Sequence, residues 1–222
     1  AGRTILDVNV MGTHAVLEAA RRRGVRRIVY ASSTSVYGES QYRDAEMDEE
    51  KTPPVPDAIY GITKYAGERL SLRYRTMWDM DVVSARIGAV FGPWERDTGY
   101  RDLLSSFFQL ACLAVEGKEA ILPRRDLRRD RVYARNVADG LVALLFAESP
   151  TFEVYNLASG FAVGSGEWCA RLKARYPAFT YRVAASGEKA NVDHHETRNR
   201  APQSIRRMAE DICFRPRFSF EE

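Results

Sequence analysis

The strongest constraint in the sequence is a β-branched run, a long helical segment and a second β-branched run that follow one another directly. The first run is VRRIVYASS at residues 25–33, the helical segment covers residues 60–78, and the second run, DVVSARIGAVFGP, covers residues 81–93. A strand, a helix and a strand in this order favour a right-handed parallel crossover. The sequence therefore predicts an α/β protein with a parallel sheet.

Further helices and strands are predicted on both sides of this unit. Residues 4–23 carry apolar side chains at helical spacing and end at Gly24. Residues 38–57 are acidic and rich in proline, which is typical of a loop. Downstream, the patterns predict a helix over 101–116, an extended piece followed by a helix within 131–149, a strand over 151–159, and helices over 166–177 and 202–210.

The composition narrows the class of protein without identifying it. The 222 residues can bury a hydrophobic core, and 33 basic against 30 acidic side chains give a net charge of +3. So small a charge gives no reason to expect a nucleic-acid or membrane partner, and no apolar run reaches the roughly 20 residues that span a bilayer. Three widely spaced cysteines predict neither a disulfide nor a zinc site and favour a reducing, cytoplasmic setting: Cys112, Cys169 and Cys213.

Hydroxyl side chains occupy the end of the first predicted strand and the residues that follow it, positions 32–35. In a parallel sheet, ligands bind beyond the carboxyl ends of the strands, so Ser32, Ser33 and Thr34 are candidates for hydrogen bonds to a ligand. The alternative is that they cap or turn the chain, as serine and threonine commonly do.

Tyr60 and Lys64 form a second candidate pair, because positions i and i+4 share one face of a helix. A phenol has a reference pKa of about 10 and is a poor base at neutral pH unless a nearby cation favours its phenolate form. Lys64 could supply that cation. The alternative is a buried tyrosine beside a surface lysine, and the spacing alone does not decide between the two.

Motifs in a fixed order surround this pair. SSTSVYG is followed by an acidic, proline-containing loop, then by YGITKYAGE and by a strand that ends in RIGAVFGP. DVNVMGTHAVLEAARRRGVRRIVYASS leads into them, and RRDRVYARNVADGLVALL, VYNLASG and DICFRPRFSFEE follow. In this order, and over nearly the whole chain, the motifs resemble the extended short-chain dehydrogenase/reductase family of NAD-dependent nucleotide-sugar epimerases and dehydratases. The resemblance implies a Rossmann-like, doubly wound parallel sheet with a small substrate-binding region towards the C-terminus.

The resemblance also implies roles for individual residues. Tyr60 would exchange a proton with a substrate hydroxyl while a hydride passes between its carbon and nicotinamide, Lys64 would hold the ribose hydroxyls and favour the phenolate form, and Ser33 would orient the reacting oxygen. The cofactor contacts expected besides Tyr60 and Lys64 are Ser32, Gly88, Ala89 and Val90. The expected substrate contacts are Ser33, Thr34, Ala89 and Arg129, and no metal is expected.

Three positions depart from the family pattern and leave the substrate open. Ala89 stands where the epimerases commonly carry an asparagine that touches substrate, Arg131 replaces an aromatic residue, and Asn136 replaces an aspartate. Arg129 matches an arginine that contacts a substrate diphosphate in those enzymes, but it is equally open to interpretation as a surface residue of a basic loop. The leading hypothesis is a nucleotide-sugar epimerase or dehydratase, of the 4-epimerase type. The alternatives are a dehydrogenase of a free sugar or sugar acid and a non-catalytic dimerisation module.

The family's glycine-rich, pyrophosphate-binding turn has no counterpart in the sequence, and both ends of the sequence look cut. We therefore expect residues 1–100 to form the C-terminal part of an NAD-binding domain. Residues 101–222 are expected to hold the substrate-binding region and a returning strand near 152–158. NAD is the expected cofactor, with NADP not excluded, and the chain as given is expected to bind it weakly.

Two further expectations concern the surface of the protein. A homodimer is expected through helices 4–23 and 60–78, which form a four-helix interface in the family that the chain resembles. His194 and His195 lie in a polar stretch without a third ligand at useful spacing, so both are expected to be exposed.

Overall fold

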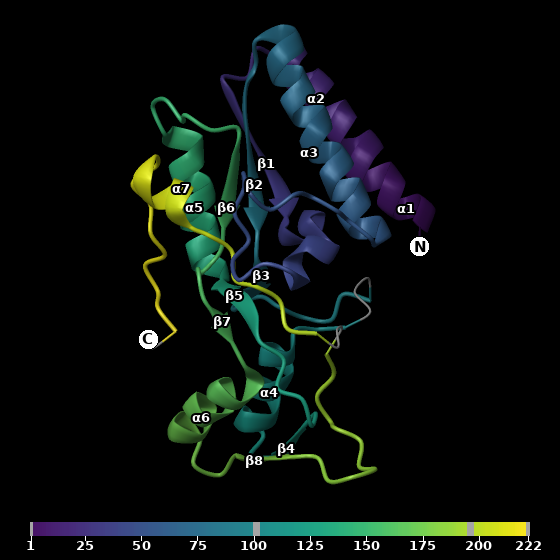
Figure 1. The fold of residues 1–222 in the computed structure, drawn as a ribbon, viewed down its shortest axis with the longest axis vertical. Helices are drawn as coiled ribbons and strands as arrows, with labels where there is room; N and C mark the ends of the chain where they lie inside the picture. The colour runs from purple at the N-terminus through teal and green to yellow at the C-terminus, as the bar shows by residue number, and fades with distance from the viewer. Residues whose placement is uncertain (1, 100–102, 195–197, 221–222) are drawn as a thin grey trace.

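The chain forms an upper part built around a parallel sheet and a lower part of short helices and strands (Figure 1). The computed structural model describes residues 2–99, 103–194 and 198–220. Within these residues, no helix has the length and apolar character of a membrane span.

Three parallel strands form the main sheet, in the order β1 (Arg27–Ser33), β2 (Asp81–Ile87), β6 (Val154–Leu157). The chain passes from β1 to β2 through α3 (Ile59–Trp78), so the predicted parallel crossover is confirmed. Ser33 pairs with Ile87, and Ile87 pairs with Leu157, so the three strands end at one edge of the sheet. In α/β proteins this is the edge at which ligands bind.

An N-terminal helical segment lies beside α3 (Figure 1). Its consecutive pieces are α1 (Gly2–Leu6), a stretch of π-helix (Asp7–Gly12) and α2 (Thr13–Arg22). The predicted helix over 4–23 is confirmed, and it contains a wide turn that the sequence pattern did not indicate. At this wide turn, the hydroxyl of Thr13 donates a hydrogen bond to the carbonyl oxygen of Asn9 at 2.7 Å, in addition to the backbone hydrogen bonds of the helix.

The remaining elements come largely from the second half of the chain. The predicted helices over 101–116 and 166–177 are found as α4 (Ser106–Val115) and α6 (Ser165–Arg175). The first begins later than predicted, and residues 101 and 102 lie outside the described residues. The sequence did not predict three strands: β4 (Glu119–Leu122), β7 (Ala162–Val163) and β8 (Thr180–Val183). Each has four residues or fewer, which is too short for a clear alternation of apolar side chains. The full set is α4 (Ser106–Val115), β4 (Glu119–Leu122), β5 (Arg129–Tyr133), α5 (Ala134–Phe146), β7 (Ala162–Val163), α6 (Ser165–Arg175), β8 (Thr180–Val183) and α7 (Arg206–Glu210).

The single strand predicted over 81–93 is wrong, because the chain breaks at Gly88 into β2 and β3 (Ala89–Phe91). β3 leaves the main sheet and pairs with β5, and β7 completes this second sheet. A Cβ at residue 88 would lie 3.1 Å from Gln203 Oε1 and 3.3 Å from the Ala158 Cβ, so close packing favours glycine at the break. The break turns the next residues towards the lower part of the molecule.

A buried ion pair fastens α3 to the sheet. Glu68 of α3 is fully buried and accepts hydrogen bonds from Arg86 of β2, at 3.1 Å from Nε and 2.7 Å from Nη2. The same carboxylate accepts from the Ser32 hydroxyl of β1 at 2.7 Å and lies 3.4 Å from the Ser84 hydroxyl of β2. One carboxylate therefore bonds to two neighbouring strands and fixes the helix over both.

We expect Glu68→Gln to destabilise the fold by about 3–5 kcal/mol, because the substitution leaves the Arg86 cation buried without a counter-charge. Replacing both partners, Glu68→Leu with Arg86→Met, removes the buried charge altogether and should cost less than the single substitution. Urea unfolding monitored by circular dichroism measures both. The control is Glu116→Gln, at an exposed pair with Lys118, which should leave the midpoint unchanged. A Glu68→Gln midpoint equal to that of the control would contradict the assigned role.

Candidate active site

The first turn of α3 lies directly against the segment that follows β1. A Cβ on Gly61 would come within 2.5 Å of the Ser35 carbonyl oxygen, so the absence of a side chain lets the helix and this segment touch. Tyr60, the residue before this contact, is 48% exposed. Its phenol is therefore accessible at the carboxyl end of the sheet, and the sequence alternative of a buried tyrosine is wrong.

A chain of two hydrogen bonds ties the first turn of α3 to the N-terminal helix. Thr63 Oγ1 donates to the Tyr60 carbonyl oxygen at 3.0 Å and accepts from Asn9 Nδ2 at 3.0 Å. The backbone at Tyr60 is thereby held by two elements, which restricts where its side chain can lie.

Lys64 lies one turn further along α3 and reaches the end of β1. Its ammonium group donates to the carbonyl oxygen of Ala31 and lies 4.7 Å from the centre of the Tyr30 ring, while the Tyr30 hydroxyl donates to the Lys64 carbonyl oxygen at 3.3 Å. Partial burial lowers the pKa of Lys64, and the Glu68 carboxylate opposes that shift. An ammonium group carries three donors, so two remain for a ligand.

The three hydroxyl residues after β1 have different surroundings. Ser33 Oγ accepts from the Ser35 backbone N–H at 3.1 Å and so caps a short 3₁₀ turn, Thr34–Tyr37, which leaves its own proton free to be donated. The Ser32 hydroxyl donates a hydrogen bond to the Glu68 carboxylate, and Thr34 Oγ1 lies 3.8 Å from the sulfur of Met47. Ser33 is thus both a cap and a candidate donor, whereas the contacts expected of Ser32 and Thr34 to cofactor and substrate stay predictions.

The residues after β2 lead from the sheet edge into a small cavity. The Gly88 backbone N–H donates to the Leu157 carbonyl oxygen at 3.0 Å, and the next two residues, Ala89 and Val90, line a cavity of about 80 Å³. Arg129 is buried and lines the same cavity. The interpretation of Arg129 as a surface residue is therefore wrong, because the residue is only 8% exposed.

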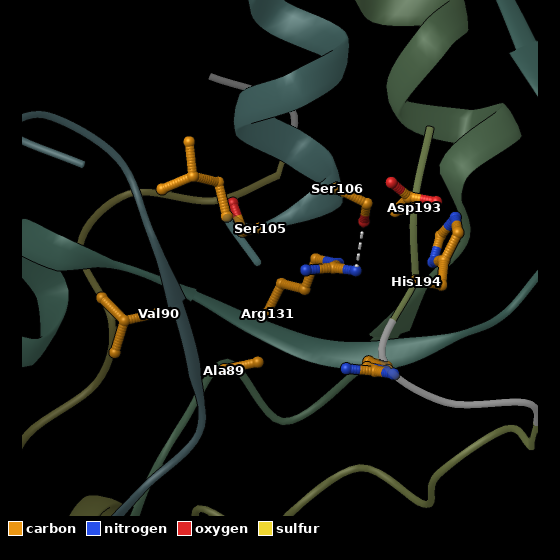
Figure 2. A pocket seen from close by; sticks show the side chains of 9 residues that line it. Ala89, Val90, Ser105, Ser106, Arg131, Asp193 and His194 are labelled. Carbon is orange, nitrogen blue, oxygen red and sulfur yellow. Dashed lines mark hydrogen bonds between the residues drawn. The ribbon is translucent and has the colours of Figure 1, made fainter. Parts of the chain in front are cut away.

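Six further residues line this cavity and were not assigned to a site from the sequence: Leu104, Ser105, Ser106, Arg131, Asp193 and His194. Figure 2 shows Arg131 reaching from β5 towards Ser106 at the start of α4, with Asp193 and His194 drawn to the right of both and Ala89 and Val90 to the left. His194 is only half-exposed, and its Nε2 lies 3.4 Å from Ser165 Oγ, so the expectation of an exposed side chain is wrong for this residue. His195 lies outside the described residues. The departure from an aromatic residue at position 131 is the one signal that pointed here.

The structure thus brings the expected residues together in two groups. Ser33, Tyr60 and Lys64 surround the end of β1 and the start of α3, whereas Ala89 and Arg129 belong to the cavity. Ala89 joins the groups, because it follows Ile87 by two residues, and Ile87 is the pairing partner of Ser33. Within the described residues, no group of three or more His, Cys, Asp or Glu side chains is arranged to hold a metal ion.

A known protein family matches more than half of the chain. The family described as NAD dependent epimerase/dehydratase matches residues 2–158. The chain belongs to this family. The resemblance drawn from the sequence motifs is confirmed, and so is the Rossmann-like α/β fold.

Individual relatives are found among curated proteins and solved structures. The chain is 39% identical to a uronate dehydrogenase of Pseudomonas syringae over 87 residues, which are 39% of the chain and 31% of the relative. It is 31% identical to the dTDP-D-glucose 4,6-dehydratase of Mus musculus over 157 residues, 69% of the chain and 41% of that protein. The structure of MoeE5 in complex with UDP-glucuronic acid and NAD is similar, with a TM-score of 0.75 and 26% identity, over 96% of the chain and 67% of MoeE5. The chain spans less than half the length of these two curated relatives.

We expect Gly61→Ala to destabilise the fold by about 1–3 kcal/mol, because the added methyl group would collide with the Ser35 carbonyl oxygen and force α3 away from the strand end. Urea unfolding measures the loss. The matched control is Gly166→Ala in α6, where a Cβ meets nothing closer than 3.8 Å. This control should be neutral or stabilising by up to about 1 kcal/mol, since alanine is the better helix former. Equal midpoints for the two variants would contradict the close contact.

Proposed function

We propose that the whole protein oxidises a sugar hydroxyl with NAD as cofactor and acts on a nucleotide sugar as an epimerase or dehydratase. The observation that carries the proposal is the placement of Tyr60 and Lys64 on the first two turns of α3, against the carboxyl end of β1, in a chain of the NAD dependent epimerase/dehydratase family. Relatives named as a dTDP-D-glucose dehydratase and a putative UDP-glucose 4-epimerase support the substrate class.

The side chains at the sheet edge suit proton transfer. In the proposed reaction, the exposed Tyr60 side chain acts in its phenolate form, accepts the proton of the sugar hydroxyl and becomes a neutral phenol, and the Ser33 hydroxyl holds the same oxygen in place. NAD, when bound, accepts the hydride from the carbon that carries this oxygen. Because a carbon releases hydride readily only as its oxygen loses a proton, the two residues act on the atom that controls the step.

Lys64 and Gly88 fit the nicotinamide half of the cofactor. Lys64 keeps two ammonium donors for the ribose hydroxyls, and the residues from Gly88 to Val90 follow β2 at the ligand-binding edge of the sheet. These features do not discriminate NAD from NADP, and the family's description favours NAD.

A second candidate function is the oxidation of a sugar acid without epimerisation. Ala89 and Arg131, which stand in place of the asparagine and aromatic residue of the epimerase pattern, favour it. Two relatives named as uronate dehydrogenases, 39% and 40% identical over 87 residues, favour it too. The two functions differ in their products: a dehydrogenase accumulates NADH, whereas an epimerase returns the hydride to the sugar.

We further propose that the protein is a homodimer through the N-terminal helical segment and α3. These helices lie side by side, and several of their large apolar side chains are exposed. They include Val8 and Met11 of the π-helical stretch, Val16 of α2, and Ile62, Met77 and Trp78 of α3. Four helices from two copies would cover this surface, which is large for a monomer to leave in water.

We expect Met11→Glu combined with Val16→Glu to convert the dimer into a monomer, because two carboxylates would be buried at the proposed interface. Sedimentation velocity measures the change in mass. The matched control is Val142→Glu on α5, which is 54% exposed and lies on another face. A wild-type protein that sediments as a monomer at micromolar concentration would contradict the proposal.

We expect Tyr60→Phe in the whole protein to lower kcat by several orders of magnitude, since the ring is kept and the transferable proton is lost. Turnover of a nucleotide sugar, with NADH absorbance followed in parallel, measures the loss and separates epimerase from dehydrogenase. The matched control is Tyr181→Phe in β8, another exposed tyrosine in the lower part, which should keep full turnover. Because Tyr60 is half-exposed, the variant should unfold at the wild-type urea concentration. Wild-type turnover by Tyr60→Phe would rule out the assigned role.

A further inference from the structure

Arg131 is a buried arginine that is held by neutral groups. Arg131 is only 6% exposed, and its Nη2 donates to Ser106 Oγ at 2.7 Å. The guanidinium carbon lies 4.3 Å from the centre of the Phe107 ring. The buried Nε has no hydrogen-bond partner in the part of the chain that the structure describes. A hydroxyl and a ring face orient the guanidinium without neutralising its charge.

No carboxylate of the described residues forms a direct ion pair with Arg131. Burial lowers the pKa of Arg131 to about 10, the Glu95 carboxylate opposes the shift, and Arg200 adds to it. Glu95 accepts from the backbone N–H and the hydroxyl of Ser105, at 2.6 and 2.7 Å, so its carboxylate is directed to α4. Buried cations are normally paired with an anion, and a bound ligand could supply the one needed here.

The cavity beside Arg131 has the size of a chemical group rather than that of a whole ligand. Its volume is about 80 Å³, against roughly 300–1,000 Å³ for pockets that enclose drug-sized molecules. Ala89 and Val90 give it an apolar wall, and Arg131 lines the same cavity. Arg129 adds a second buried guanidinium to the wall, and Asp193 adds one carboxylate.

We propose that Arg131, oriented by Ser106 and Phe107, binds a carboxylate on the sugar ring of the substrate, so that the protein selects an acidic sugar. A planar guanidinium suits the two oxygens of a carboxylate, and the apolar wall excludes the water that would compete for it. Ala89 is the pairing partner of Arg131 and lies two residues beyond the end of β2, which places the cavity next to the proposed reaction edge. The assignment rests on the proposed sugar chemistry and makes Arg131 a determinant of specificity.

The test compares two ligands that differ only in the acidic group, UDP-glucuronic acid and UDP-glucose. Isothermal titration calorimetry would measure their binding to the whole protein with NAD, in the Tyr60→Phe background so that no turnover interferes. We expect Arg131→Leu to weaken UDP-glucuronic acid about ten- to a hundredfold, the range for a charge-assisted hydrogen bond, and to change UDP-glucose less than twofold. Arg131→Lys keeps the charge without the planar fork and should recover part of the loss.

Two controls separate recognition from folding. Arg128→Leu removes a neighbouring exposed arginine that pairs with Glu167 at 2.6 Å, and should leave both affinities unchanged. Arg131→Leu removes a buried charge, so its urea midpoint should equal or exceed that of the parent. Ser106→Ala is a second test of the role of Arg131, because it keeps the arginine and removes only the hydroxyl that orients it. It should weaken the acidic ligand selectively.

The possible outcomes decide between the assignments. Equal losses for both ligands would assign Arg131 to the diphosphate that they share and would overturn the proposal, as would unchanged affinities. Selective loss of UDP-glucuronic acid supports it, even if the wild-type protein turns over neither sugar. In that case the proposed reaction would fail while the recognition of the carboxylate would stand.

Discussion

The buried carboxylate of Glu68 is the interaction on which the candidate active site depends. It bonds to Ser32 in one strand and Arg86 in the next, so it fixes both the distance of α3 from the sheet and the rotation of α3 about its own axis. Tyr60, Lys64 and Glu68 are spaced four residues apart and share one helix face. With Glu68 anchored over the strands, Lys64 reaches the strand end and Tyr60 extends beyond it into solvent.

The parts of the fold that could be predicted are those whose own sequence determines them. α3 has 20 residues and β1 and β2 have seven each, enough for their apolar periodicity to stand out. The break at Gly88 could not be predicted, because it depends on a distant part of the sequence. After the break, β3 pairs with β5, whose Val132 lies some 40 residues further along the chain. β8 was missed for a related reason: all four of its residues are exposed, so it has no buried face to reveal it.

The candidate site likewise has one part that local sequence determines and one part that only the tertiary fold brings together. Ser33, Tyr60 and Lys64 lie at the ends of locally determined elements, and their motifs are readable in the sequence. The cavity is built from β3, α4, β5 and residues 193 and 194, and no local pattern connects Ser106 with Arg131 or His194. Burial also reverses the ordinary expectation for a basic loop: Arg128 is exposed and paired with Glu167, whereas Arg129 and Arg131, its near neighbours in sequence, are enclosed.

The position of β6 in the main sheet has a consequence for how the protein can be divided. β6 comes from the last third of the chain, yet it pairs along β2, and α5 packs on the same sheet. In the main sheet, β6 crosses the division expected near residue 100, which placed a returning strand near 152–158 in its second part and stays a prediction. A fragment ending there would leave one edge of β2 without its hydrogen-bonding partner and one face of the sheet uncovered. The two parts are therefore interdependent in folding, and neither is suited to be transplanted as an autonomous module.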